Sequence, residues 1–371
     1  SFIEKLDILK DAAEGGTFLL NSPFGPDEIW DKLPLTYQKR IIDKKLKFYV
    51  VDAVKVAEQT GMGSRTNTIL QTCFFAISQI LPQDEAIAAI KDSIVKTYTK
   101  KGQAVVDKNI AAVDATLREL HEVKVPAETT ATFDLLPAVT NEDAPEYVKE
   151  VLGKMMKLEG NSLPVSAFAD APDGSFPSGT TQYEKRGAAI YVPQWDPQMC
   201  IQCGQCVLVC PHAAIRAKVC DPAMLDDAPE TFKTAEAKFP NFKGQAFTIQ
   251  IATEDCLGCG LCAKTCPMVK AKPQDEHRPL QMKSLMDVRE AGRECWSYFL
   301  DLPEADPTLL NTSTVKDVQL KRPLFEFSGA CAGCGETPYL KLLSQLFGDR
   351  AIIGNATGCS SIYGGNLPTT P

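Results

Sequence analysis

Two segments of the sequence carry four cysteines each at one shared spacing, C-x2-C-x2-C-x3-C-P. They contain Cys200, Cys203, Cys206 and Cys210, and Cys256, Cys259, Cys262 and Cys266. Three thiolates at this spacing wrap a short loop around one iron–sulfur cubane, and the fourth cysteine of each run ligates the other cluster of a pair. Small residues let the backbone come close to such a cluster, and Gly204, Gly258 and Gly260 stand where they would do so.

The spacing therefore predicts two [4Fe–4S] clusters whose ligands cross between the two segments. The expected sets are Cys200, Cys203, Cys206 and Cys266 for the first cluster, and Cys210, Cys256, Cys259 and Cys262 for the second. A pair of zinc sites is the alternative, because C-x2-C pairs also build zinc ribbons. Zinc ligands usually come as two separated pairs, so two compact sets of four, each closed by a proline, favour iron–sulfur. Two clusters in series would relay electrons.

Over this module the sequence resembles the bacterial two-cluster ferredoxins. It departs from them by an insert, residues 217–244, between the two cysteine segments. Cys220 lies in this insert, and we expect it, like Cys73 and Cys295, to be a buried apolar residue rather than a ligand. A disulfide framework is disfavoured, because such frameworks are typical of short secreted chains and this chain has 371 residues.

A third set of cysteines follows in the stretches CAGCGETPY and GCSSIYGG. It consists of Cys331, Cys334 and Cys359, one thiolate short of the four that a cubane needs. A structural zinc site with a distant fourth ligand is one interpretation. The other is a third cluster whose fourth cysteine lies beyond Pro371, since we expect both ends of this sequence to be cut points in a longer chain.

The order of these segments resembles the interior of pyruvate:ferredoxin oxidoreductase. The resemblance covers the whole chain, and CAGCGETPY and GCSSIYGGNLPTTP are its most diagnostic motifs. In that family the third cysteine set binds a cluster proximal to thiamine diphosphate, with a fourth cysteine further on. The family's thiamine-pyrimidine domain and its diphosphate–magnesium motif are not in this sequence, so we expect it to be an internal fragment of the enzyme.

The resemblance implies oxidative decarboxylation of pyruvate to acetyl-coenzyme A and CO2. Thiamine diphosphate with Mg²⁺, bound mainly outside this segment, would stabilise the carbanion, and three [4Fe–4S] clusters would pass the electrons singly to ferredoxin or flavodoxin. The resemblance also implies a homodimer. It assigns no catalytic side chain within this segment, and other 2-oxo acids stay open as substrates. A non-catalytic iron–sulfur electron-transfer subunit is the alternative that the ferredoxin module alone would support.

Coenzyme A is the co-substrate that the resemblance implies, and residues 1–146 resemble the family's domain associated with its binding. This part contains the loop GMGSR, which could form a phosphate-binding nest, although a plain turn explains it equally well. Arg65 and Asn67 are the candidate coenzyme A contacts in and after this loop.

Charge and hydropathy exclude two classes of partner. The net charge of −8 disfavours a nucleic-acid groove, which needs a basic surface. No apolar run reaches the roughly 18 residues of a membrane span. The nearest run, residues 68–81, is interrupted by polar residues and predicts a buried helix instead. Because no basic and apolar signal segment opens the sequence, we expect a cytoplasmic protein.

Residues 1–146 are predicted to form an α/β domain with a parallel sheet, because strand and helix patterns alternate along them. The expected strands are 17–21 and 47–54. The expected helices are 2–16, 68–81, 84–98 with Asp84 as its N-cap, and 105–120.

The rest of the chain is predicted to have three parts, so that the fold class combines α/β and α+β. An irregular linker spans residues 147–187 and the two-cluster ferredoxin-like domain spans 188–304. Residues 305–371 are expected to begin a thiamine-diphosphate-binding α/β domain. In it, a helix capped by Thr337 ends at Gly348, and a strand at 351–355 places Cys359 at the carboxyl end of a parallel sheet, where ligand sites gather.

Overall fold

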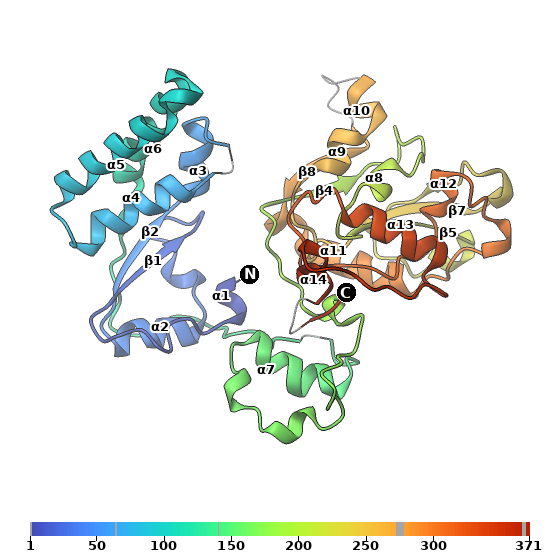
Figure 1. Ribbon diagram of the computed structural model, residues 1–371, viewed down its shortest axis with the longest axis horizontal. Coiled ribbons are helices and arrows are strands. Elements are labelled where there is room, and N and C mark those ends of the chain that lie inside the picture. The colour runs from blue at the N-terminus through green and yellow to red at the C-terminus, as the bar shows by residue number, and fades with distance from the viewer. Residues whose placement is uncertain (1, 64, 140, 272–277, 366–368) are drawn as a thin grey trace. The chain divides into compact units, whose positions relative to one another are not determined.

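The computed structural model describes residues 2–63, 65–139, 141–271, 278–365 and 369–371. The chain divides into two compact units, one from Ile3 to Leu136 and the other from Pro137 to Pro371 together with Phe2 (Figure 1). None of the helices in the described ranges is both long and apolar enough to cross a membrane.

The first unit is built on a small mixed sheet. Its strands are β1 (Thr17–Asn21), β2 (Lys47–Val51) and β3 (His121–Glu122). β1 and β2 are parallel in the register Thr17 to Lys47, which confirms the strand expected at 17–21 and the first part of the strand expected at 47–54. The end of the second expected strand is wrong, because Asp52 caps a helix that begins at Ala53. The expectation of a parallel sheet is wrong for the third strand. β3 pairs with the other edge of β2 and runs antiparallel to it.

Six helices accompany this sheet. They are α1 (Phe2–Lys5), α2 (Leu35–Asp43), α3 (Ala53–Gln59), α4 (Asn67–Ser78), α5 (Gln83–Tyr98) and α6 (Gln103–Glu119). α4, α5 and α6 pack together as a layer, and the three long helices expected from periodicity are confirmed. The expectation that the helix at 68–81 is buried holds for one face only, because α4 ends at Ser78 and Phe74 is 49% exposed. Two details are wrong: the first helix is a single turn, because Leu9 turns into the core instead of continuing it, and the N-cap of α5 is Pro82 rather than Asp84.

The second unit begins with the segment expected to be irregular. It forms one turn of π-helix (Val148–Leu152) that continues into α7 (Gly153–Met156), followed by short 3₁₀ turns. Val148 and Leu152 form a small apolar cluster with Tyr147 and Phe176.

The cysteine-rich core of the second unit consists of two antiparallel sheets and short helices. Its strands are β4 (Tyr191–Trp195), β5 (Ile215–Cys220), β6 (Ala235–Glu236), β7 (Ala246–Ile251) and β8 (Leu280–Ser284), paired as β4–β8 and β5–β7–β6. Its helices are α8 (Gln205–Leu208), α9 (Leu261–Thr265), α10 (Pro267–Ala271) and α11 (Leu285–Asp301). The insert at 217–244 lengthens the β5–β7 hairpin and adds β6 to its edge.

The last part of the second unit contains three helices, α12 (Val315–Val318), α13 (Thr337–Phe347) and α14 (Cys359–Gly364). α13 ends before Gly348 as expected, although Glu336 rather than Thr337 is its N-cap. The strand expected at 351–355 is wrong: this segment is irregular and Ile353 is 69% exposed. Within the described residues after 305 no strand lies beside it to share hydrogen bonds, so the expected parallel sheet does not support Cys359.

Candidate metal centres

The two four-cysteine segments fold into equivalent loops. In each, the third cysteine lies on a short helix, α8 or α9, whose N-cap is a glycine with left-handed φ, 73° at Gly204 and 70° at Gly260. Gly258 also has a positive φ of 68°, and a Cβ there would lie 2.9 Å from the carbonyl oxygen of Tyr191. Only glycine meets both demands at that position without strain.

Each of two small cavities is bounded by one set of four cysteines. The first is lined by Cys200, Cys203, Cys206 and Cys266, with Trp195, Ile249 and Leu280 among the apolar side chains around them. The second is lined by Cys210, Cys256, Cys259 and Cys262, with Ile215, Ile251 and Leu261. The structure therefore brings together the two crossed sets that the spacing predicts, each with its fourth cysteine from the opposite segment.

The donors around these sulfurs fit a cluster. The backbone N–H of Ala214 points at Cys210 Sγ (3.3 Å), and that of Gln202 at Cys200 Sγ (3.4 Å). Such bonds favour the negative charge of a cluster thiolate. Burial raises the pKa of the Cys262 thiol to about 12, and the neighbouring Cys210 thiol adds to this shift. Positively charged iron in the cavity would stabilise the thiolate form of the cysteines that line it.

No three His, Cys, Asp or Glu side chains in the described part of the chain are gathered to hold a metal ion. A cubane makes a different demand from a single ion, because each thiolate binds its own iron and the four sulfurs stand apart around the cube. Three further cysteines were expected to be buried apolar residues rather than ligands. They are Cys73, Cys220 and Cys295, and all three are buried in apolar clusters.

The third cysteine set lies on two segments. Cys331 and Cys334 close a turn, with Cys334 N donating to Cys331 O at 3.0 Å, and Cys359 is the first residue of α14. Burial acts to raise the pKa of Cys334, but the backbone N–H groups of Thr337 and Glu336 outweigh it and lower that pKa. Tyr363 is buried, and this burial raises its pKa to about 12. The negative charges of Cys334 and Cys359 raise the same pKa further.

The turn that carries Cys331 and Cys334 lies directly against the second cavity. A Cβ built on Gly333 would be 3.6 Å from the Cβ of Cys259. His212 lines the same cavity, and its Nε2 lies 3.3 Å from the carbonyl oxygen of Cys331. Burial lowers the pKa of His212, which favours a neutral ring. The turn with two of the three cysteines of the third set, Cys331 and Cys334, is therefore next to the second cavity.

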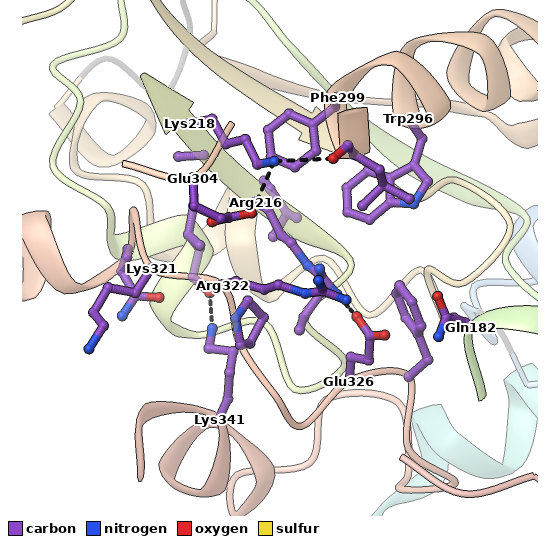
Figure 2. Close-up of a pocket in the computed structure, with 18 of the residues that line it drawn as sticks. Gln182, Arg216, Lys218, Trp296, Phe299, Glu304, Lys321, Arg322, Glu326 and Lys341 are labelled. Carbon is purple, nitrogen blue, oxygen red and sulfur yellow. Dashed lines mark hydrogen bonds and ion pairs between the residues drawn. The ribbon is translucent and has the colours of Figure 1, made fainter. Parts of the chain in front are cut away.

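A larger cavity of about 460 Å³ opens on another side of this core, lined by β5, α11, α13 and residues 319–327. Figure 2 shows that charged side chains fill its walls. Buried Arg216 pairs with buried Glu326, and its guanidinium lies 5.1 Å from the ring centroid of Trp296. Lys218 Nζ is 3.0 Å from Glu304 Oε1.

Lys341, on the α13 wall of this cavity, is 1% exposed. Its Nζ donates to the carbonyl oxygens of Leu208, at 2.9 Å, and Val207. Burial lowers the pKa of Lys341 to about 8, against the attraction of the Cys210 and Cys206 thiols.

The coenzyme A candidates lie in the first unit. Arg65 is exposed in the loop before α4, and Asn67 is the exposed first residue of that helix. Gly61 and Gly63 in this loop have φ values of 70° and 65°. Thr66 caps α4 without a side-chain hydrogen bond, so the first N–H groups of the helix have no side-chain cap from it.

Sequence reasoning missed His212, Arg216, Glu326 and Lys341. A cysteine motif is visible along the chain, whereas these residues gain their environment from segments more than a hundred residues away, 119 for His212 and 134 for Lys341. The one local signal is on α13, where Thr337, Lys341 and Gln345 share one face of the helix at four-residue intervals.

Three family models match successive parts of the chain. Residues 2–119 match "Pyruvate ferredoxin/flavodoxin oxidoreductase", residues 134–189 match a domain of unknown function, and residues 199–270 match "4Fe-4S dicluster domain". The last match spans both cysteine segments and the two cavities that they line.

Relatives match the chain along its whole length. It is 52% identical over 376 residues to pyruvate-flavodoxin oxidoreductase of a Nostoc species and 50% identical over 372 residues to pyruvate:ferredoxin oxidoreductase of Moorella thermoacetica. It is also 41% identical over 372 residues to the mitochondrial pyruvate dehydrogenase [NADP(+)] of Euglena gracilis. The matched region is 100% of this chain but 31%, 31% and 20% of those proteins, so the chain spans about a third of the first two and less of the third.

Proposed function

We propose that this chain, which is similar along its whole length to pyruvate-flavodoxin and pyruvate:ferredoxin oxidoreductases, is the electron-relay segment of such an enzyme. The reaction is the oxidation of pyruvate with coenzyme A to acetyl-coenzyme A and CO2. The observation that carries the proposal is the pair of four-cysteine cavities, with the turn that contains Cys331 and Cys334 beside the second of them.

The roles of the chain's own residues follow from this arrangement. The two crossed sets hold one [4Fe–4S] cluster each, and Cys331, Cys334 and Cys359 contribute to a third. Thiamine diphosphate with Mg²⁺, held mainly by other regions, supplies the carbanion chemistry when bound. Because a Cβ built on Gly333 would lie 3.6 Å from the Cβ of Cys259, a cluster held by the third set would stand next to the one held in the second cavity, and the three together would supply one-electron transfer. The apolar side chains that line the two four-cysteine cavities keep water away from the sulfurs inside them.

The acceptor, the assembly and the location are part of the same proposal. The names of the relatives favour ferredoxin or flavodoxin as acceptor, whereas the Euglena relative is named for NADP(+). A homodimer in the cytoplasm fits the family resemblance and the need for a compartment that keeps thiols reduced. Residues 1–146, 147–187, 188–304 and 305–371 are proposed as the coenzyme A-associated domain, the linker, the ferredoxin-like domain and the start of the thiamine domain.

The test is cofactor dependence in the purified full-length protein, handled without oxygen. We expect reduction of ferredoxin or flavodoxin by pyruvate to require both coenzyme A and thiamine diphosphate, and to stop when either is removed. Clusters that are reduced by an external donor with no requirement for either cofactor, and no turnover with pyruvate, would instead support a non-catalytic electron-transfer subunit. Turnover with 2-oxoglutarate or a branched 2-oxo acid in place of pyruvate would correct the substrate alone.

A second test addresses coenzyme A. We predict that Arg65→Ala raises the KM for coenzyme A about tenfold with little change in kcat, because a guanidinium–phosphate hydrogen bond contributes roughly 1.5–3 kcal/mol. Asn67→Ala should act in the same direction but more weakly, since its amide carries no charge. Arg118→Ala, which removes an exposed arginine at the end of α6, is the matched control. Equal KM values for the Arg65 and Arg118 variants would remove this loop from the coenzyme A site.

A further inference from the structure

α13 packs with its polar face inward. Thr337, Lys341 and Gln345 are its buried residues, whereas Tyr339 is 74% and Phe347 is 50% exposed. A surface helix ordinarily buries its apolar face. Burying a lysine in this way costs free energy unless an opposite charge compensates it.

The negative charges near Lys341 come from the cysteines. Its Nζ donates hydrogen bonds to the carbonyl oxygens of Val207 and Leu208. Within the described part of the chain, no carboxylate forms a hydrogen bond or ion pair with it. Those residues lie between Cys206, which lines the first cavity, and Cys210, which lines the second. As thiolates, both cysteines attract the Lys341 ammonium group, whereas Arg216 repels it.

We propose that the buried ammonium group of Lys341 is the shared counter-charge of the two clusters in the cysteine-rich core and raises their reduction potentials. The inference rests on the proposed ligation of those clusters. Reduction adds one negative charge to a cluster, so a fixed cation nearby stabilises the reduced form more than the oxidised form. The effect is strong here because the ammonium group is screened little by solvent.

A purely structural role makes a different prediction. If Lys341 serves only to hold the C-terminal end of α8, a neutral donor of similar shape would replace it without changing the potentials. Lys341→Gln separates the two roles, because glutamine keeps an N–H donor for the carbonyl oxygens and removes the charge.

The experiment is a redox titration of the cluster-loaded protein, with the reduced clusters followed by electron paramagnetic resonance. In Lys341→Gln we expect the equilibrium constant for reduction of at least one of the two clusters to fall about tenfold, a shift of about 59 mV to more negative potential. Lys321→Gln is the matched control. Lys321 lines the same cavity but is only partly buried, so its charge is screened and no shift is expected. Unchanged potentials in Lys341→Gln with full iron content would overturn the proposal.

A second variant decides the question if Lys341→Gln loses iron. Gln345→Glu places a carboxylate one turn from Lys341 on the same buried face and leaves both Lys341 hydrogen bonds in place. It should shift the potentials in the same negative direction, and unchanged potentials there would also overturn the proposal. The cluster assignment and the role of Lys341 are contradicted by different results. Absence of iron from the wild-type protein would contradict the cluster assignment, whereas intact clusters with unshifted potentials contradict only the role of Lys341.

Discussion

Replacing Cys210 by alanine is expected to remove about four irons per chain, all from the cluster whose other ligands are Cys256, Cys259 and Cys262. The physical reason is the fold of the two segments. Cys210 follows Cys206 closely in sequence, but its side chain lines the second cavity while Cys206 lines the first. Iron and sulfide content, measured on anaerobically purified protein, gives the size of the loss.

Double variants identify which cluster is lost. Combining Cys210→Ala with Cys256→Ala removes two ligands of one cluster, so the loss should equal that of either single change. Combining Cys210→Ala with Cys200→Ala removes one ligand from each cluster and should double the loss. The reverse result, with additivity for the Cys256 pair and none for the Cys200 pair, would show that each segment binds its own cluster. Cys220→Ala, at a buried cysteine that lines neither cavity, should keep all the iron.

The cysteine sets could be predicted from the sequence because ligand spacing is a local property. Four thiolates in one short loop have few uses, and the crossing follows from the geometry of the repeat. Strands β1 and β2 could also be predicted from the sequence, because each is a short, mainly apolar run that contains aromatic or β-branched residues.

The missed features depend on partners far along the chain. Ile352 and Ile353 carry a local strand signal, but a strand needs a neighbour, and no strand lies beside them in the described part of the chain after 305. Arg216 and Glu326 lie 110 residues apart and give no sign in the sequence that they will pair. The polar face of α13 contradicts the rule that the apolar face is buried, so periodicity alone would have turned Lys341 outward.

The Arg216–Glu326 pair carries the second large effect. Glu326→Leu should lower the local opening free energy of β5 by about 3–5 kcal/mol, because it leaves a buried guanidinium without its opposite charge. Both side chains are nearly inaccessible, 7% and 9% exposed, and the guanidinium of Arg216 lies against the rings of Trp296 and Phe327. Amide hydrogen exchange in β5 measures the local opening free energy directly. A global unfolding curve does not, because a protein with several units need not unfold in one step.

A second substitution in the same pair tests the cause. Arg216→Met in the Glu326→Leu background removes the unpaired charge and leaves a flexible apolar side chain against the two rings. We expect most of the lost protection to return, since replacing both partners of a buried ion pair by apolar residues is often close to neutral. Glu290→Gln, in the exposed pair with Arg293, should cost less than about 1 kcal/mol. The double variant has no unpaired buried charge. If its β5 amides are as weakly protected as those of Glu326→Leu alone, the loss of protection comes from altered packing around Glu326 and the unpaired-charge explanation is wrong.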